Sequence, residues 1–584
     1  MSSPHLWERS ACAIALSAAF ICAPHLVLAQ APPQATPGAV QPQPPALPPA
    51  APPGAPSLSI PRMLDRPLGL QEGPRVRVGR FRLTGATDHR RLGLYVSELQ
   101  RWLGDALQKQ PAVGYTINEL QQLATQLTDY YHHRGLILAQ VILPAQEVQG
   151  GVVELRVLEG KLEAVKVEGN KHNRTSALQA PFGPLVGQSI EQDRIDAALL
   201  RLIDYPGLVV QGVVTPGTAV DTSDLLLRVT RENLFDFDQS LDNFGNKLSG
   251  EDRYTAGVHW NSPLGLGDRL YVYGLQTFTI HDGSEHTTYG GVDYRIPFFA
   301  ALSALDVSYS LNDYAVGQQL GITGKVRDAE GSYHQELFRN RTTLLYADAI
   351  FADKHADLSF PAGLPRGQEY LADAGADMGL RYSDDWHGFS DVGLGYVHGW
   401  LASPSAGDQR ARTGADPTYN IVNYHFQRQQ QISRYQTLVV TVGGQWTDEA
   451  LPTLEELALG GPANVRGFDV AAYVADEGEY GSIEYLIGAP GFASRPAFGG
   501  KTWGDLLQFS VFGDIGHGST NKGLNPQPSL PSETMRDVGA ALQFNLPNRV
   551  YARVSWARRL APSIYFTQFD SKEDYIYGSI GIHL

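Results

Sequence analysis

The chain has 584 residues, enough for several domains or for one very large barrel. Its formal net charge of −15 argues against a nucleic-acid partner, because phosphate binding needs clustered cations and we find no such cluster. Tyrosine (27 residues) and glycine (61 residues) are frequent, which suits β-structure with amphipathic rings at an interface. A secreted, soluble β-rich protein would share most of these features.

The first 29 residues predict a secretory signal peptide. A short apolar run follows Arg9, and small residues precede a cleavage point expected after Ala29. The run is too short to span a membrane, and no later stretch approaches the ~18 consecutive apolar residues of a membrane helix. Both cysteines, Cys12 and Cys22, lie in this segment. The mature chain is therefore expected to contain no disulfide, no thiolate ligand and no cysteine nucleophile.

Residues 30–74 predict a proline-rich linker. Much of the segment consists of Pro, Ala and Gln, as in QPQPPALPPAAPPGAP. Such a composition cannot bury a core, so we expect an extended spacer that is partly polyproline helix.

Residues 75–160 predict a first small α+β module. A capping box, Thr116-Ile117-Asn118-Glu119, opens a helix with apolar positions at Leu120, Leu123 and Leu127, and Gly135 follows its end. Strand-like runs lie before and after this helix: VGRFRLTGAT, LILAQVIL and GVVELRVLEG.

Residues 161–232 repeat this pattern as a second module. A second capping box begins at Ser189, and the helix that follows has apolar positions at Ile195, Leu199 and Leu202. The two boxes are 73 residues apart, so each module has roughly 75 residues. The apolar helix faces of both modules are either plain core or part of a groove for a partner.

Residues 235–584 predict an antiparallel barrel. Apolar and polar residues alternate along many segments; for example, Leu305 and Val307 alternate with Asp306 and Ser308. In a soluble sandwich the apolar face would point inward, whereas in a membrane barrel it points to lipid. Charges on the polar face favour the membrane barrel, because they suit a wet lumen: Asp293, Asp306, Asp391 and Arg553. The length accommodates about 16 strands.

Several stretches resemble one known family, the two-partner secretion outer-membrane transporters of the TpsB type (the hemolysin/hemagglutinin secretion-activation family). These transporters belong to the superfamily of membrane barrels that carry periplasmic POTRA modules. The similar stretches are YYHHRGLILAQVILPAQEVQGGVVELRVLEGKLEAVKVEGN, YPGLVVQGVVTPG with TSDLLLRVT, LDNFGNKLSGEDRY and ALGGPANVRGFD. The resemblance covers roughly residues 75–584. It implies a membrane β-barrel of about 16 strands after two POTRA modules, 75–160 and 161–232.

The resemblance also implies a functional loop around residues 452–480. The motif Val465-Arg466-Gly467-Phe468 is similar to the tip of the family's sixth extracellular loop, which folds back into the barrel. FSVFGDIG resembles the acidic wall motif, so Asp514 is the expected partner of Arg466. A guanidinium and a carboxylate can form a charge-assisted, bidentate contact, and Gly467 is expected to allow a sharp chain reversal. The alternative is an exposed turn with a solvated arginine.

The implied function is export of an unfolded secreted partner, expected to be a large β-helical exoprotein, from the periplasm through the outer membrane. The POTRA modules would bind the partner by β-augmentation beside the two predicted helices. We expect a monomer in outer-membrane lipid, with no metal, no cofactor and no nucleic acid. The proline-rich segment leaves no room for the pore-plugging helix of many relatives. The alternatives are a barrel-assembly insertase of the same superfamily and a passive porin.

An enzyme is not expected. The sequence contains neither a Gly-x-Ser-x-Gly elbow nor a His-Glu-x-x-His zinc helix. FGGKT (498–502) has a likeness to a phosphate loop, but Arg495 stands where the first glycine of that motif is required, and we interpret the likeness as chance.

Overall fold

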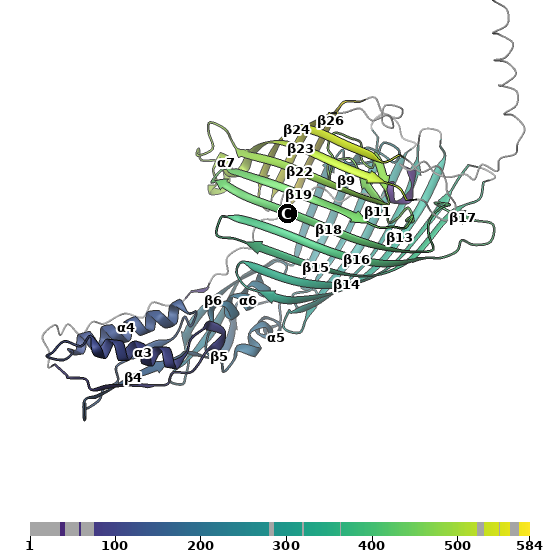
Figure 1. Ribbon diagram of the computed structural model, residues 1–584. Helices are drawn as coiled ribbons and strands as arrows, with labels where there is room; N and C mark the ends of the chain where they lie inside the picture. The colour runs from purple at the N-terminus through teal and green to yellow at the C-terminus, as the bar shows by residue number, and fades with distance from the viewer. Residues whose placement is uncertain are drawn as a thin grey trace, which may run out of the picture.

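The computed structural model describes residues 35–40, 58–59, 75–279, 285–317, 320–361, 364–521, 531–547, 549–560 and 572–584. The predicted signal peptide lies outside these residues. The chain forms one large barrel, and two small α+β modules extend from one of its ends (Figure 1).

The first module packs two helices against a three-stranded sheet of order β2-β4-β3, in which β2 is parallel and β3 antiparallel to β4. Its elements are β2 (Arg80–Thr84), η2 (Arg90–Leu92), α3 (Val96–Gln108), α4 (Ile117–His133), β3 (Gln140–Ile142) and β4 (Val152–Leu158). The helix α3 was not predicted, although its buried residues Leu99, Leu103 and Ala106 have helical spacing.

The second module has a four-stranded sheet of order β1-β6-β7-β5. Its elements are β1 (Leu58–Ser59), β5 (Lys161–Glu168), α5 (Thr175–Gln179), η3 (Ala180–Leu185), α6 (Gln192–Ile203), β6 (Leu208–Pro216) and β7 (Thr222–Glu232). The strand β1 comes from the proline-rich segment and runs parallel to β6, with Leu58 opposite Gly212 and packed on the module core. The segment therefore supplies part of a sheet, which the expectation of a plain spacer did not include.

The two predicted helices begin in different ways. In α4 the capping box is present: the Glu119 backbone N–H donates to Thr116 Oγ1 (3.1 Å), and the Thr116 N–H donates to Glu119 Oε2 (2.7 Å). The second predicted box is wrong, because α6 has no side-chain cap and Ser189 Oγ instead donates to Glu159 Oε2 (3.2 Å). Among the helices of the described residues, none combines the length and the apolar character needed to cross a membrane.

Sixteen antiparallel strands close the barrel, as the sequence predicts. They are β8 (Phe235–Asp242), β9 (Asp252–Asn261), β10 (Arg269–Phe278), β11 (His286–Phe298), β12 (Ser303–Val316), β13 (Ile322–Arg339), β14 (Thr343–Ser359), β15 (Gly367–Ser383), β16 (Gly388–Leu401), β18 (Thr418–Ser433), β19 (Gln436–Trp446), β22 (Glu477–Gly488), β23 (Leu507–Ser519), β24 (Glu533–Leu546), β25 (Val550–Arg559) and β26 (Asp574–His583). A two-residue strand, β17 (Gln409–Arg410), pairs with β15. The last strand pairs with the first, with Ile580 opposite Leu241, so the wall has no free edge.

The outer wall is apolar and the inner wall is charged. On β12, Leu305, Val307 and Tyr309 are between 42% and 51% exposed. Between them, Asp306 points to the other face, where its Oδ2 lies 2.7 Å from Arg295 Nη1. Exposed apolar rows around a closed barrel with ion pairs inside are the pattern of a membrane barrel, and not of a soluble sandwich.

Aromatic rings on the inner wall lie over glycines of neighbouring strands. A Cβ atom added to Gly257 would lie 2.6 Å from the Tyr271 ring, and one added to Gly399 would lie 2.1 Å from the Tyr419 ring. The glycines thus let these rings lie flat against the wall, an arrangement that stabilises strand pairing where glycine alone would weaken it.

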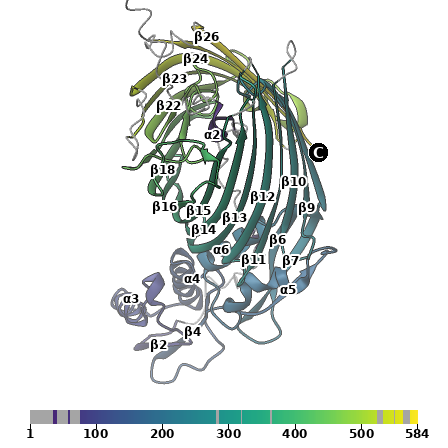
Figure 2. The ribbon, with the colours of Figure 1, turned by 90° about the vertical axis from the view of Figure 1, so that its right-hand side faces the viewer.

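A short helix from the proline-rich segment, α2 (Pro37–Val40), lies inside the barrel (Figure 2). Ala39 is buried, and its carbonyl accepts a hydrogen bond from Asn246 Nδ2 (3.4 Å). A Cβ atom on Gly38 would lie 2.0 Å from the Thr453 carbonyl oxygen, so the contact is close. This corrects two expectations, namely that the segment buries nothing and that no helix enters the pore. Small side chains allow a helix of a single turn to fit.

The second module contacts the module-side end of the barrel through α6. Three ion pairs join them: Arg201–Glu336, Asp204–Arg339 and Asp196–Arg341. The Asp196 side chain is fully buried, and Arg341 Nη2 donates to its Oδ1 at 3.0 Å. A cavity of about 900 Å³ lies between α6 and this end of the barrel, and both signs of charge line it.

Candidate functional site

The loop between β19 and β22, residues 447–476, folds back into the barrel. Two short strands, β20 (Leu457–Leu459) and β21 (Tyr473–Ala475), pair to form its stalk. At the tip, the exposed fractions are 0% for Val465, 7% for Arg466 and 1% for Phe468. The alternative of an exposed turn with a solvated arginine therefore does not describe this loop.

Asn464 stabilises the turn at the tip. Its Oδ1 accepts from the backbone N–H groups of Gly460 and Val465 (both 2.7 Å), and its Nδ2 donates to the Ala458 carbonyl (2.9 Å). Gly460 has φ of 107°, a left-handed conformation that favours glycine. The hydrogen bonds of the Asn464 side chain thus replace those that the backbone no longer makes by strand pairing after the end of β20.

Arg466 contacts two neighbouring strands of the wall. Its Nε and Nη2 donate to the two carboxylate oxygens of Asp514 on β23 (2.8 and 2.7 Å). Its Nη1 donates to Glu484 Oε2 (2.7 Å), and its Nη2 also donates to Ser482 Oγ (2.8 Å), both on β22. The guanidinium carbon lies 3.3 Å from the centre of the Phe512 ring. Its side-chain nitrogens are therefore engaged in a rigid, bidentate contact.

Charges of both signs lie around Arg466. Glu484 also accepts from Arg553 Nη2 (2.7 Å), so two arginines face the two carboxylates of Glu484 and Asp514. Burial disfavours the charged guanidinium, but the hydrogen bonds and the charges of Asp514 and Glu484 outweigh it, and the pKa of Arg466 is raised above its ordinary value. If one of these arginines or carboxylates were removed, its partner would remain as an uncompensated buried charge.

Gly467 has a different role from the one expected. Its backbone φ is not positive, so no left-handed reversal requires a glycine there. Instead its N–H donates to Asp537 Oδ2 (2.7 Å), and a Cβ atom would lie 2.4 Å from Asp537 Cβ. Glycine is needed because the loop backbone approaches the β24 wall closely.

The rest of the tip is fixed by packing and by its carbonyl. Phe468 packs with Leu459, Val465 and Met535, and Arg559 lies over its ring at 4.4 Å. Its carbonyl accepts a hydrogen bond from the Tyr577 hydroxyl.

Further ion pairs fix the base of the loop. Glu455 Oε1 lies 2.7 Å from Lys354 Nζ on β14. Arg412, between β17 and β18, pairs with Glu456 (3.0 Å) and with Asp476. The loop is thus held to the wall at both its base and its tip.

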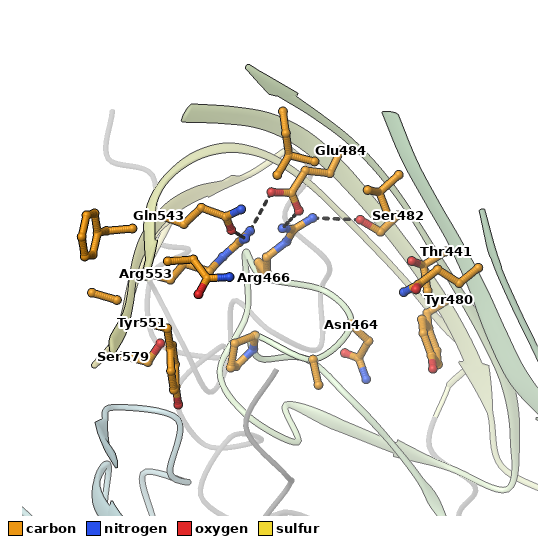
Figure 3. A pocket seen from close by; sticks show the side chains of 18 residues that line it. Thr441, Asn464, Arg466, Tyr480, Ser482, Glu484, Gln543, Tyr551, Arg553 and Ser579 are labelled. Atoms are coloured by element: carbon orange, nitrogen blue, oxygen red, sulfur yellow. Dashed lines mark hydrogen bonds and ion pairs between the residues drawn. The ribbon is translucent and has the colours of Figure 1, made fainter. Parts of the chain in front are cut away.

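A cavity of about 160 Å³ borders the tip inside the barrel (Figure 3). Its polar lining includes Asn464, Arg466, Glu484, Gln543 and Arg553. The Arg466 and Arg553 side chains converge on Glu484 in this view. The lumen beside the loop is therefore polar and has room for water.

The apolar helix positions considered as cargo contacts lie mostly in the module cores. Five are buried and Leu123 is partly buried; the buried ones are Leu120, Leu127, Ile195, Leu199 and Leu202. A groove for a partner must therefore be formed by other atoms, such as strand edges.

Several wall residues around the tip were not predicted, among them Glu484, Phe512 and Asp537. Glu484 and Asp537 lie on strands whose register relative to β23 is set by long-range pairing, which no local motif encodes. Phe512 lies inside the FSVFGDIG stretch two residues before Asp514, so period-two alternation places both on the inner face.

Family models match two parts of the chain. The model described as haemolysin secretion/activation protein ShlB/FhaC/HecB matches residues 221–484, and the model for a POTRA domain of the ShlB type matches residues 96–160. Together they span the end of the second module, most of the barrel, and much of the first module.

Relatives and solved structures agree with these matches. The heme/hemopexin transporter protein HuxB of Haemophilus influenzae is 23% identical over 472 residues, covering 77% of this chain and 79% of the relative. The outer membrane transporter CdiB of Escherichia coli is 24% identical over 444 residues, covering 70% and 68%. The structure of CdiB from Escherichia coli superposes with a TM-score of 0.67 at 19% identity, covering 89% of this chain and 93% of that one. It shows the same fold.

Proposed function

Because this chain belongs to the haemolysin secretion/activation family of ShlB, FhaC and HecB, we propose that its barrel exports a partner protein that the two periplasmic modules recognise in unfolded form. The chain is an outer-membrane transporter of the two-partner secretion type. The observation that carries the proposal is the combination of a closed, charged lumen, an inward-folded loop and two small modules at one end of the barrel.

The partner would meet the transporter at sheet edges. An unfolded chain can add a strand to an exposed edge, where backbone hydrogen bonds give affinity whatever the side chains. In the first module the edge strands are β2 and β3, beside helices α3 and α4. In the second, β1 covers the β6 edge and β5 is the other edge strand. The side chains of Leu120, Leu127 and Ile195 would then support these edges from the core rather than touch the partner.

Passage of a partner through the barrel would require the loop tip and α2 to move out of the lumen. The loop tip and α2 both lie inside the wall, and an extended chain needs the space that they occupy. The Arg466–Asp514 contact would hold the loop in the position from which export begins. Because the periplasm contains no nucleotide, folding of the partner outside the cell would supply the free energy that drives export.

The partner is proposed to be a large β-helical exoprotein, and the transporter is proposed to act as a monomer without enzymatic activity. The closed barrel has no unpaired strand that a second copy would need to complete. Relatives of the matched family have names that describe transporters, for heme/hemopexin in HuxB. Two modules after a proline-rich segment favour secretion over the insertase alternative.

Co-expression with a neighbouring reading frame tests the proposal. The frame should encode a large protein with a signal peptide and β-helical repeats, and the transporter should release it into the medium. Deletion of residues 75–160 should abolish capture of the partner's N-terminal part in a pull-down. Export without this chain, or undiminished capture by the deletion variant, would contradict the proposal.

A further inference from the structure

The turn between β22 and β23, residues 489–506, is unusually long for its end of the barrel. The chain enters the barrel from the second module at β8, and successive strands alternate in direction, so this turn lies at the module side, as α7 (Trp503–Leu506) does in Figure 1. Two neighbouring turns at that end comprise only residues 434–435 and 547–549. We call residues 489–506 the periplasmic hairpin.

The periplasmic hairpin has its own ordered structure. Pro496 and Thr502 form an antiparallel bridge that encloses the turn η4 (Phe498–Gly500). The Trp503 N–H donates to the Arg495 carbonyl (3.0 Å), and the N–H and hydroxyl of Thr502 donate to Asp505 Oδ2 at the start of α7 (2.8 and 2.7 Å). These bonds fix the direction in which the hairpin projects.

Aromatic rings cluster on the hairpin. Trp503 packs edge-on against Phe492 and Phe498, with ring centres 6.1 and 5.6 Å apart. Phe498 remains 57% exposed. Beyond the hairpin, Phe509 and Val511 on β23 continue an exposed apolar row along the outer wall. Aromatic rings at the end of such a row are typical of the level where lipid headgroups begin.

Cations lie on the hairpin and on two neighbouring turns, although the whole chain is acidic. Arg495 and Lys501 on the hairpin, Arg434 on the β18–β19 turn and Arg549 on the β24–β25 turn are exposed. Among the residues that the structure describes, no ion pair involves any of these four. By contrast, the arginines at the β13–β14 turn are paired with α6 of the second module. The hairpin carries one carboxylate, Asp505, whose pKa is lowered by hydrogen bonds from Thr502 and by the charges of Arg434 and Lys501. The hairpin and the two neighbouring turns therefore keep a net positive charge.

We propose that the periplasmic hairpin binds anionic phospholipid of the periplasmic leaflet of the outer membrane. Phe498 and Trp503 would lie among the glycerol and upper acyl groups, and Arg434, Arg495 and Lys501 would bind the headgroup phosphate. Arg495 and Lys501 lie on the same short segment as the rings, and the turn that carries Arg434 contacts this segment through the hydrogen bond from Thr502 Oγ1 to the Tyr435 hydroxyl (3.3 Å), so one lipid can contact both rings and cations. The FGGKT stretch then forms the tip of a lipid-binding turn.

A single introduced cysteine tests whether the periplasmic hairpin binds anionic phospholipid. Both natural cysteines precede the predicted cleavage site, so Ser494→Cys would give the mature chain one labelling position, next to the cations. The full mature protein carrying a polarity-sensitive dye there would be placed in nanodiscs of phosphatidylethanolamine, with or without phosphatidylglycerol. We expect a blue shift of the dye emission that depends on phosphatidylglycerol and disappears in high salt. Inorganic phosphate in phosphatidylethanolamine discs should not reproduce it.

Matched charge variants give the control. The triple variant Arg434→Gln, Arg495→Gln, Lys501→Gln should lose the shift. A variant with the same loss of charge on the first module should keep it: Arg101→Gln, Lys109→Gln, Arg156→Gln. Equal emission in both lipid compositions, or an undiminished shift in the first triple variant, would overturn the proposal. The comparison of lipids needs no charge variant, so it decides the question even if the triple variant fails to assemble.

Discussion

Replacing Arg466 by alanine tests the loop anchor most directly. The substitution removes four side-chain hydrogen bonds, two of them to Asp514, whose side chain is fully buried. Breaking a buried pair in this way costs about 3–5 kcal/mol, because a charge is left without a partner. The docked position of the loop should therefore lose roughly two to four orders of magnitude in population relative to undocked positions.

Export should fall accordingly while the barrel still assembles. The measurement is the amount of partner in the culture medium, normalised to folded transporter by heat-modifiable migration on a gel. Arg466→Lys keeps the charge but lacks the planar fork, so it should export an intermediate amount. Arg101→Ala, at a position whose side chain is 76% exposed, is the control and should export normally.

A double variant makes the test quantitative. If Arg466 and Asp514 act through one contact, Arg466→Ala combined with Asp514→Asn should export about as much as the worse single variant. If instead the loss of export in the double variant equals the product of the losses in the two single variants, the two residues act separately. Full export by Arg466→Ala would refute the view that this loop takes part in transport.

Three further substitutions have expected outcomes. Gly467→Ala should undock the tip and reduce export, because its Cβ would collide with the β24 wall, whereas Gly104→Ala, with open space around it, should be neutral or stabilise α3 by ~0.5–1 kcal/mol. Asp196→Asn should weaken the contact of α6 with the barrel and raise hydrogen exchange in α6; unchanged exchange would argue against that contact. Leu127→Ala should destabilise the first module by about 2–5 kcal/mol and expose it to limited proteolysis, unlike the surface change Gln122→Ala on the same helix.

The barrel could be predicted because its sequence pattern depends only on residues that are neighbours in the chain. Lipid on one side and water on the other impose period-two alternation, as at Leu305, Asp306 and Val307, and every strand repeats this signal. The capping box at Thr116 is equally local, since all its atoms lie within four residues. The loop tip could be recognised because its motif lies in one short stretch.

Other features depend on contacts that sequence patterns do not contain. The similar stretch at Ser189 does not cap its helix, because Glu159, a residue at the junction of the two modules, binds that hydroxyl instead. Glu484 and Asp537 belong to the site only through strand register. The helix α2 was missed because a proline- and alanine-rich segment has no periodicity, and its stability comes from the lumen that receives it.

The position of α2 has a practical consequence for anyone who labels this protein. A purification tag inserted next to α2 would adjoin a helix that has little free space, since a Cβ atom on Gly38 would already lie 2.0 Å from the Thr453 carbonyl oxygen. A tag appended to Leu584 would follow a residue whose N–H donates to the Phe237 carbonyl. Either fusion would therefore disturb the structure of the protein that it labels. An epitope inserted at Gly407, where the backbone has open space around it, is the safer choice.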